Sequence, residues 1–121
     1  MLGERAPDQA GAIERAIDTT RARSTDDIDD LCCGEAGRIE ILMALAAHRG
    51  DDALGAEAGR ALAARLPDWS AGRVRLMARQ AGAPDDPALY RGIGGPMHLL
   101  VRSIAPQWAS PCLLPLSPSR R

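Results

Sequence analysis

Two adjacent cysteines followed by a glycine are the residues of this sequence best suited to chemistry. Gly34 gives the backbone freedom to turn after Cys32 and Cys33, so that both thiolates can face one borderline-soft metal ion. A helix expected from about Arg38 places the positive end of its dipole nearby, which lowers the pKa of a thiol. From the pattern alone, Cys32 and Cys33 are therefore candidate ligands of a zinc ion.

Two other interpretations of the cysteine pair stay open. Free cysteine is among the most buried residue types, so Cys32 and Cys33 could instead act as small apolar residues of a core. A disulfide between neighbouring residues is strained, and a reducing compartment disfavours it.

A catalytic zinc usually has three protein ligands and one open position, so the pair needs a third donor. The candidates within the chain are Cys112, His48 and His98, none at a short metal-type spacing from the pair. Simpler interpretations are a favourable charge at a helix C-terminus for His48, a packing role for His98 and a core thiol for Cys112.

The composition favours one small all-α domain. The chain has 121 residues and only 2% aromatics, so its core must depend on small aliphatic side chains, which suit packed helices better than strands. A net charge of −1 gives no field for nucleic acid. No stretch approaches the roughly 18 apolar residues of a membrane span, and the N-terminus lacks an apolar signal region, so we expect a cytoplasmic protein.

Hydrophobic periodicity predicts four helices. They are expected over Asp8 to about Arg23, Arg38 to His48, Asp51 or Asp52 to Leu66, and Pro96 to just before Pro106. Asp8 is expected to cap the first, Gly50 to end the second and Pro67 to stop the third. The predicted buried faces are Ile13, Ala16 and Ile17; Ile39, Leu42, Met43 and Ala46; Ala58, Leu62 and Leu66; and Met97, Leu100, Val101 and Ile104.

The segments between these helices carry weaker signals. Residues 24–30 form an acidic connector, and Trp69 to Gln80 fits either a short helix or a strand. Ala81 to Ala88 is expected to be a loop. From about 106–121 the chain is a Pro-rich tail, in which Cys112 to Leu114 could form a short strand.

Two of the expected helices are each preceded by a pair of glycines. Gly34-x-x-Gly37 and Gly92-x-x-Gly95 each precede an apolar run, and residues 31–37 are too glycine-rich for a helix interior. Self-similarity at this spacing suggests helical hairpins arranged in a ring or solenoid.

Three segments resemble one family in the expected order. Residues 29–40, Asp-Asp-Leu-Cys-Cys-Gly-Glu-Ala-Gly-Arg-Ile-Glu, resemble the Cys-Cys-Gly motif of the LanC-like cyclase domain in class II (LanM-type) lanthipeptide synthetases. Residues 89–102, Leu-Tyr-Arg-Gly-Ile-Gly-Gly-Pro-Met-His-Leu-Leu-Val-Arg, are similar to its last glycine-rich repeat, although Gly95-Pro96-Met97 departs from the usual Gly-Ile-Gly-Tyr. Residues 110–116 are similar to its closing segment.

The resemblance implies a partial α/α toroid, with residues 1–121 as the C-terminal portion of a ring of helical hairpins. It also implies that Cys32 and Cys33 bind zinc in a three-cysteine site, whose third ligand lies upstream in a Trp-Cys-x-Gly-like motif. The family's catalytic histidine is upstream too. Neither has a counterpart before Cys32, so the catalytic residues of this chain are unknown.

The implied reaction adds a peptide cysteine thiol to dehydroalanine or dehydrobutyrine, forming a thioether ring. Zinc favours this by lowering the thiol pKa, and the resulting enolate needs a proton from a general acid. Glu35 and Arg38 lie close to the cysteines, but a helix-start carboxylate and a solvated or structural charge are their expected roles. The implied partners are a dehydrated precursor peptide and the missing part of the synthetase.

The alternatives to an incomplete lanthionine synthetase are two small helical modules without catalysis. One keeps the fold for interaction and binds no metal. The other is an independent structural zinc domain.

Overall fold

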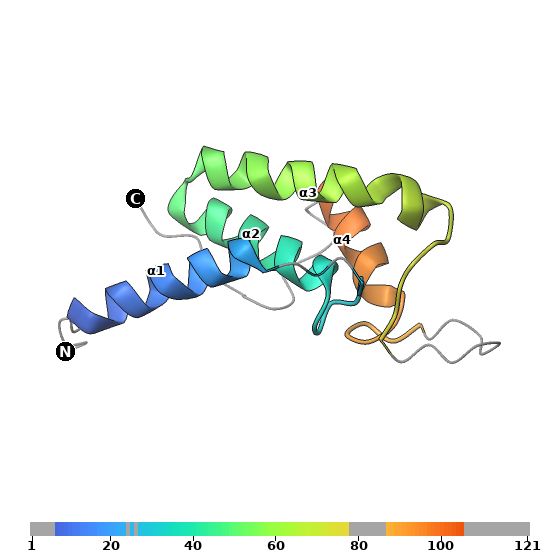
Figure 1. The fold of residues 1–121 in the computed structure, drawn as a ribbon. Coiled ribbons are helices and arrows are strands. Elements are labelled where there is room, and N and C mark those ends of the chain that lie inside the picture. Colours follow the sequence, from blue (N-terminus) through green and yellow to red (C-terminus); the bar gives the residue numbers. More distant parts are fainter. Residues whose placement is uncertain (1–6, 24, 26, 78–86, 106–121) are drawn as a thin grey trace.

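The computed structural model describes residues 7–23, 25, 27–77 and 87–105. Within these residues every regular element is an α-helix and none is a strand, so the predicted all-α class is confirmed (Figure 1). No helix of the described residues is long and apolar enough to cross a membrane. The expected loop over 81–88, apart from its last two residues, lies outside the described part, as do the Pro-rich tail and the expected strand at Cys112 to Leu114.

Helix α1 spans Pro7–Ala22, close to its predicted bounds. It begins at proline, whose fixed φ suits the first helical position, so Asp8 falls inside the helix and is not its N-cap. Of the predicted apolar face only Ile17 is buried; Ala16 and Ile13 are exposed. Helix α1 therefore contributes little to the core.

Helix α2 spans Glu35–Arg49 and starts three residues earlier than predicted. Its first turn includes Gly37, so the expectation that residues 31–37 all lie outside a helix was wrong for the last three of them. The predicted stripe is confirmed, since Ile39 and Leu42 are fully buried and Ala46 nearly so. Gly50 ends the helix at a φ of 64°, a left-handed conformation that favours glycine.

Helix α3 spans Asp52–Ser70 and packs along α2 as an antiparallel hairpin. The Asp51 carboxylate caps it by accepting from the Leu54 N–H at 2.9 Å. The predicted stop at Pro67 was wrong. Proline costs the helix one backbone hydrogen bond, but continuing to Trp69 buries that indole to 2% exposure, and burial of so large a side chain offsets the loss.

The buried side of α3 includes Leu54, Ala58 and Leu62, but Leu66, predicted with them, is 39% exposed. After the helix the chain runs without regular structure past Val74, whose side chain is buried in the core. The ambiguous segment from Trp69 to Gln80 is therefore helical only as far as Ser70. It has no regular structure from there to residue 77, where this described stretch ends.

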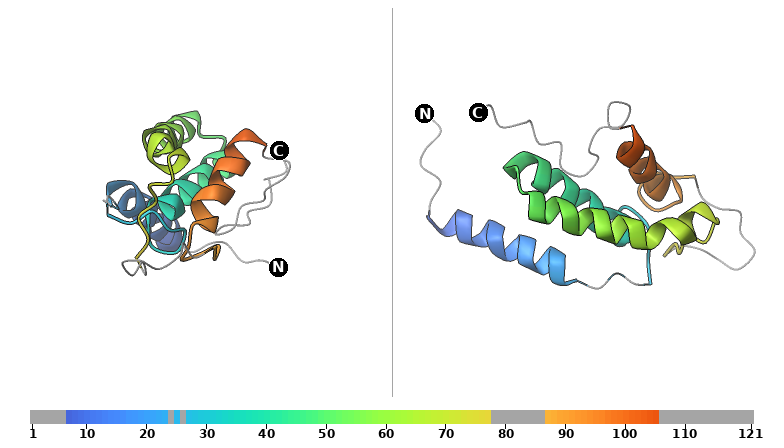
Figure 2. Two further views of the ribbon diagram at one scale, coloured as in Figure 1. Left: turned by 90° about the vertical axis from the view of Figure 1, so that its right-hand side faces the viewer. Right: turned by 90° about the horizontal axis from the view of Figure 1, so that it is seen from above.

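Helix α4 spans Gly94–Ile104 and crosses the end of the α2–α3 hairpin (Figure 2). Its predicted apolar face points outward, since Met97, Val101 and Ile104 are 36%, 44% and 83% exposed. Leu99 is fully buried instead, and Leu100 packs at the edge of the core. The core contacts of α4 therefore lie on a different face from the one that periodicity predicted.

Ion pairs around two buried carboxylates, which the sequence did not indicate, join these elements. The Arg102 guanidinium of α4 donates to the fully buried Glu40 carboxylate of α2. The carboxylate of Asp29, also fully buried, accepts from Arg65 of α3 and from Arg75 beyond it. Removing charges from water is costly unless they are paired, so each pair holds its elements in one arrangement.

Candidate metal centre

The cysteines lie in a tight turn directly before α2. The buried Asp30 holds it: its carboxylate accepts from the Cys33 N–H at 2.8 Å, and its carbonyl accepts from the Gly34 N–H at 3.1 Å. On the other side, the Cys32 N–H donates to the Tyr90 carbonyl at 2.8 Å. We call residues 29–34 the cysteine turn.

Gly34 is needed in the cysteine turn for space. A Cβ atom there would lie 2.6 Å from the Ile28 carbonyl oxygen and 2.7 Å from the Asp30 nitrogen, closer than real Cβ contacts. Its φ of −109° is open to any residue, so conformational freedom is not the reason for the glycine. The close approach lets the Glu35 N–H donate to the Ile28 carbonyl at 2.9 Å, and α2 begins there.

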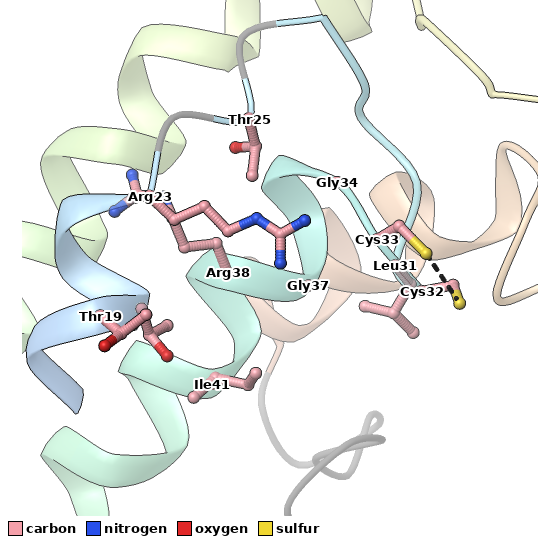
Figure 3. Close-up of a pocket in the computed structure, with 11 residues that line it drawn as sticks. Thr19, Arg23, Thr25, Leu31, Cys32, Cys33, Gly34, Gly37, Arg38 and Ile41 are labelled. Atoms are coloured by element: carbon pink, nitrogen blue, oxygen red, sulfur yellow. Dashed lines mark hydrogen bonds between the residues drawn. The ribbon is translucent and has the colours of Figure 1, made fainter. Parts of the chain in front are cut away.

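The two thiols are free, exposed and in contact. Their sulfur atoms lie 3.2 Å apart, and both side chains line an open pocket of about 150 Å³ (Figure 3). The alternative of two buried apolar cysteines is therefore wrong for this structure, and so is a vicinal disulfide.

The pKa of the Cys33 thiol is raised above its ordinary value of 9.0. The main cause is the hydrogen bond that this thiol donates to the Cys32 sulfur, followed by burial and by the negative charges of Cys32 and Asp30; only Arg23 acts in the opposite direction. The expected lowering of the thiol pKa was wrong for Cys33, because its contact with a second sulfur raises the pKa. A metal binding here must displace the thiol proton.

No third ligand joins the pair within the described residues, where no group of three metal-binding side chains is found. His48 lies in the last turn of α2, about 20 Å along the helix from the cysteine turn. His98 is on α4 and half-buried. Cys112 lies outside the described residues.

The two sulfurs fit half of a zinc site. Sulfurs bound at about 2.3 Å to one tetrahedral zinc are separated by about 3.8 Å, so the 3.2 Å pair needs only small changes of side-chain torsion. Both cysteines are exposed, which leaves room for further ligands. The residues present therefore fit two of the ligands of such an ion.

Glu35 and Arg38 are paired with each other. Arg38 Nε and Nη2 donate to the two Glu35 carboxylate oxygens at 2.9 and 2.6 Å, and the Thr25 hydroxyl also donates to this carboxylate. Their side chains are only 11% and 15% exposed. The predicted helix-start carboxylate is confirmed, and Arg38 is a structural charge rather than a solvated one.

Asp29 is a supporting residue of the cysteine turn that the sequence did not reveal, because it was assigned to an acidic connector. Its N–H donates to the Arg75 carbonyl at 2.7 Å, and its carboxylate accepts from the Arg75 N–H at 2.8 Å. Burial alone would raise the pKa of Asp29, but hydrogen bonds from Arg75 and Arg65 outweigh it and lower the pKa below 3.8. No local sequence signal marks this role, since both arginines lie far along the chain.

Comparison with known proteins adds no assignment: no protein-family model, no curated protein and no solved structure matches this chain.

Proposed function

We propose that this chain is the C-terminal portion of a LanC-like lanthionine cyclase domain, with Cys32 and Cys33 as two ligands of its zinc ion. The observation that carries the proposal is the pair of free, exposed sulfurs 3.2 Å apart at the glycine-led start of α2. Adjacent thiols held in a hydrogen-bonded turn and open to solvent are suited to metal binding rather than to core packing.

The arrangement of the helices supports a partial α/α toroid. Helices α2 and α3 form an antiparallel hairpin, with α1 and α4 against it. Ile13 on α1 and Met97, Val101 and Ile104 on α4 are exposed, and apolar faces of this kind need neighbours to cover them. The missing hairpins of the ring would provide that cover and the third zinc ligand, so the partner of this chain is the rest of the synthetase.

Within this chain the proposed roles are limited to the cysteine turn. Cys32 and Cys33 hold the metal, and the hydrogen bonds of Asp30 keep their backbone in one conformation. Zinc bound there would lower the pKa of a cysteine thiol in the dehydrated precursor peptide. That thiol would then add to a dehydroalanine or dehydrobutyrine of the peptide. We assign no catalytic acid among the described residues. The chain acts in the cytoplasm under this proposal.

Zinc content of the purified chain tests the proposal. We expect weak, substoichiometric zinc that is lost in Cys32→Ala and in Cys33→Ala but kept in the matched variant Cys112→Ala. Tight stoichiometric zinc in the isolated chain would instead support an independent structural zinc domain. No zinc, even at excess metal, would support a helical interaction module.

The coding DNA upstream gives a second, independent test. A sequence encoding a Trp-Cys-x-Gly motif there, in frame or displaced by a frameshift, would support an incomplete synthetase. An unrelated upstream gene followed by a strong ribosome-binding site would contradict it.

A further inference from the structure

The pocket beside the cysteines has two chemically different walls. The start of α2 and the cysteine turn provide the sulfurs, Leu31 and the backbone of two glycines. The opposite wall comes from the end of α1 and the residues that follow it, and it is polar (Figure 3). With about 30 Å³ per water molecule in the liquid, a volume of about 150 Å³ has room for an acyl group of a few non-hydrogen atoms.

The three threonines of the polar wall have already committed their hydroxyl protons. Thr19 donates to the Arg15 carbonyl at 2.7 Å and Thr20 to the Ala16 carbonyl at 2.8 Å. Thr25 donates to the Glu35 carboxylate. These hydroxyls can accept hydrogen bonds from a ligand, but they have no proton left to give one.

The two arginines of the pocket differ in whether their guanidinium groups already have hydrogen-bond partners among the described residues. The Arg38 guanidinium is occupied by Glu35 through two nitrogens. Arg23 is exposed, lines the pocket, and forms no side-chain hydrogen bond or ion pair within the described residues. Of these two arginines, Arg23 is therefore the one whose guanidinium, as far as the described residues show, has capacity for an added oxygen.

We propose that this pocket binds the acyl group of an α,β-unsaturated amino-acid residue, with the Arg23 guanidinium donating to the acyl oxygen. The inference rests on the cyclase proposal for the identity of the ligand. Cationic donors aimed at an oxygen where charge develops stabilise it most during the reaction.

The chemistry defines what Arg23 does. The attacking thiol gives its proton to water, a bond forms between its sulfur and the β-carbon, and the π electrons of the carbon–carbon double bond move toward the acyl oxygen as an enolate. A proton from water then reaches the α-carbon and restores the carbonyl. The Arg23 guanidinium is a permanent cation, and it balances the negative charge of the enolate.

The test uses the thiols of the purified, metal-free chain as reporters, with Cys112→Ala as the background. The alkylation rates of the cysteine pair with iodoacetate and with iodoacetamide are measured by mass spectrometry. The carboxylate of iodoacetate stands in for the charged acyl oxygen. Taking the ratio of the two rates cancels changes in thiolate fraction, since both reagents attack the same sulfur.

We expect the iodoacetate-to-iodoacetamide ratio to fall about tenfold in Arg23→Gln and to recover in part in Arg23→Lys. Arg21→Gln is the matched control, because Arg21 lies in the last turn of α1, two residues before Arg23, but pairs with Glu57 at 2.8 Å. An unchanged ratio in Arg23→Gln, or an equal fall in Arg21→Gln, would overturn the inference. Zinc binding is measured separately on Arg23→Gln: a ratio effect in a chain that never binds zinc would leave the pocket intact and remove the cyclase proposal.

Discussion

The two glycine-led helix starts, those of α2 and α4, use the same device for different purposes. At α2, Gly34 brings the chain against the Ile28 carbonyl and leaves two cysteine side chains facing solvent. At α4, a Cβ on Gly95 would lie 2.7 Å from Leu31 Cβ, so this glycine lets α4 pack directly on the cysteine turn. The start of α2 exposes the two thiols, and the start of α4 packs against the cysteine turn that carries them.

The difference shows that a repeated motif need not repeat a function. The predicted correspondence between Gly34-x-x-Gly37 and Gly92-x-x-Gly95 is confirmed as local structure, because each pair lies at the opening of a helix. The first start is preceded by thiols, and there a buried carboxylate, Asp30, holds the turn. Among the described residues 87–93 that precede the second start there is neither a thiol nor a carboxylate side chain. Side chains outside the glycines decide which start becomes a site.

Removal of the Arg102 guanidinium should have the largest effect, because it anchors α4 to α2. Arg102→Leu leaves the Glu40 carboxylate buried without that guanidinium, and we expect a loss of about 3–5 kcal/mol in the free energy of unfolding. Urea denaturation measures it. The double variant Glu40→Leu/Arg102→Leu should recover most of the loss; if it is as unstable as the single variant, charge burial is not the cause.

Substitution of either glycine should lower the free energy of unfolding by a similar amount, whereas the two substitutions should differ in their effect on zinc affinity. Gly34→Ala and Gly95→Ala each force a Cβ into contacts under 3 Å, and we expect each to cost about 2–3 kcal/mol. Zinc affinity should fall further in Gly34→Ala, because the displaced backbone carries the cysteines. Gly59→Ala is the control, since a Cβ there meets nothing within 4 Å and should stabilise α3 by up to about 1 kcal/mol. Equal zinc affinity in the first two variants would contradict the distinction drawn between the helix starts.

The smallest effect is expected at Asp29, which joins the cysteine turn to α3 and to the segment after it, on the side away from α4. Asp29→Asn should lower the free energy of unfolding by about 1.5 kcal/mol at pH 7, by weakening its hydrogen bonds with Arg65 and Arg75. Because the folded-state pKa of Asp29 is depressed, its stabilisation is complete above the unfolded pKa of about 3.9 and is lost as pH falls through the folded pKa. Urea denaturation over a pH series should show the difference between wild type and variant shrinking below pH 4. A difference that is constant with pH would mean that the carboxylate charge is not involved.

Local signals predicted most of the helices and misjudged several of their ends and faces. Gly50 and the aspartate cap act at the backbone itself. Gly50 was predicted correctly, and of the two predicted candidates, Asp51 and Asp52, the cap is Asp51. Pro67 was predicted from its local cost alone, which ignores the gain from burying Trp69 in a distant core. The outward face of α4 was predicted as buried because periodicity identifies an apolar stripe but not what lies beside it.

For the candidate site, the cysteine pair and its glycine were evident from residue types, whereas their support was not. Asp29 and Glu40 are paired with arginines that are 36 and 62 residues away in the chain, so no window of sequence reveals them. The raised pKa of Cys33 likewise depends on how two neighbouring side chains turn toward each other.

The sequence by itself determined the all-α class, the helix boundary at Gly50 and Asp51, and the presence of two thiols beside a glycine. These features follow from backbone preferences and residue chemistry. Only the tertiary structure decided that the thiols are exposed and in contact, and that a polar wall with Arg23 faces them. Exposure, contact and ion pairing depend on which distant segments share space, and this is set by the packing of all the helices together.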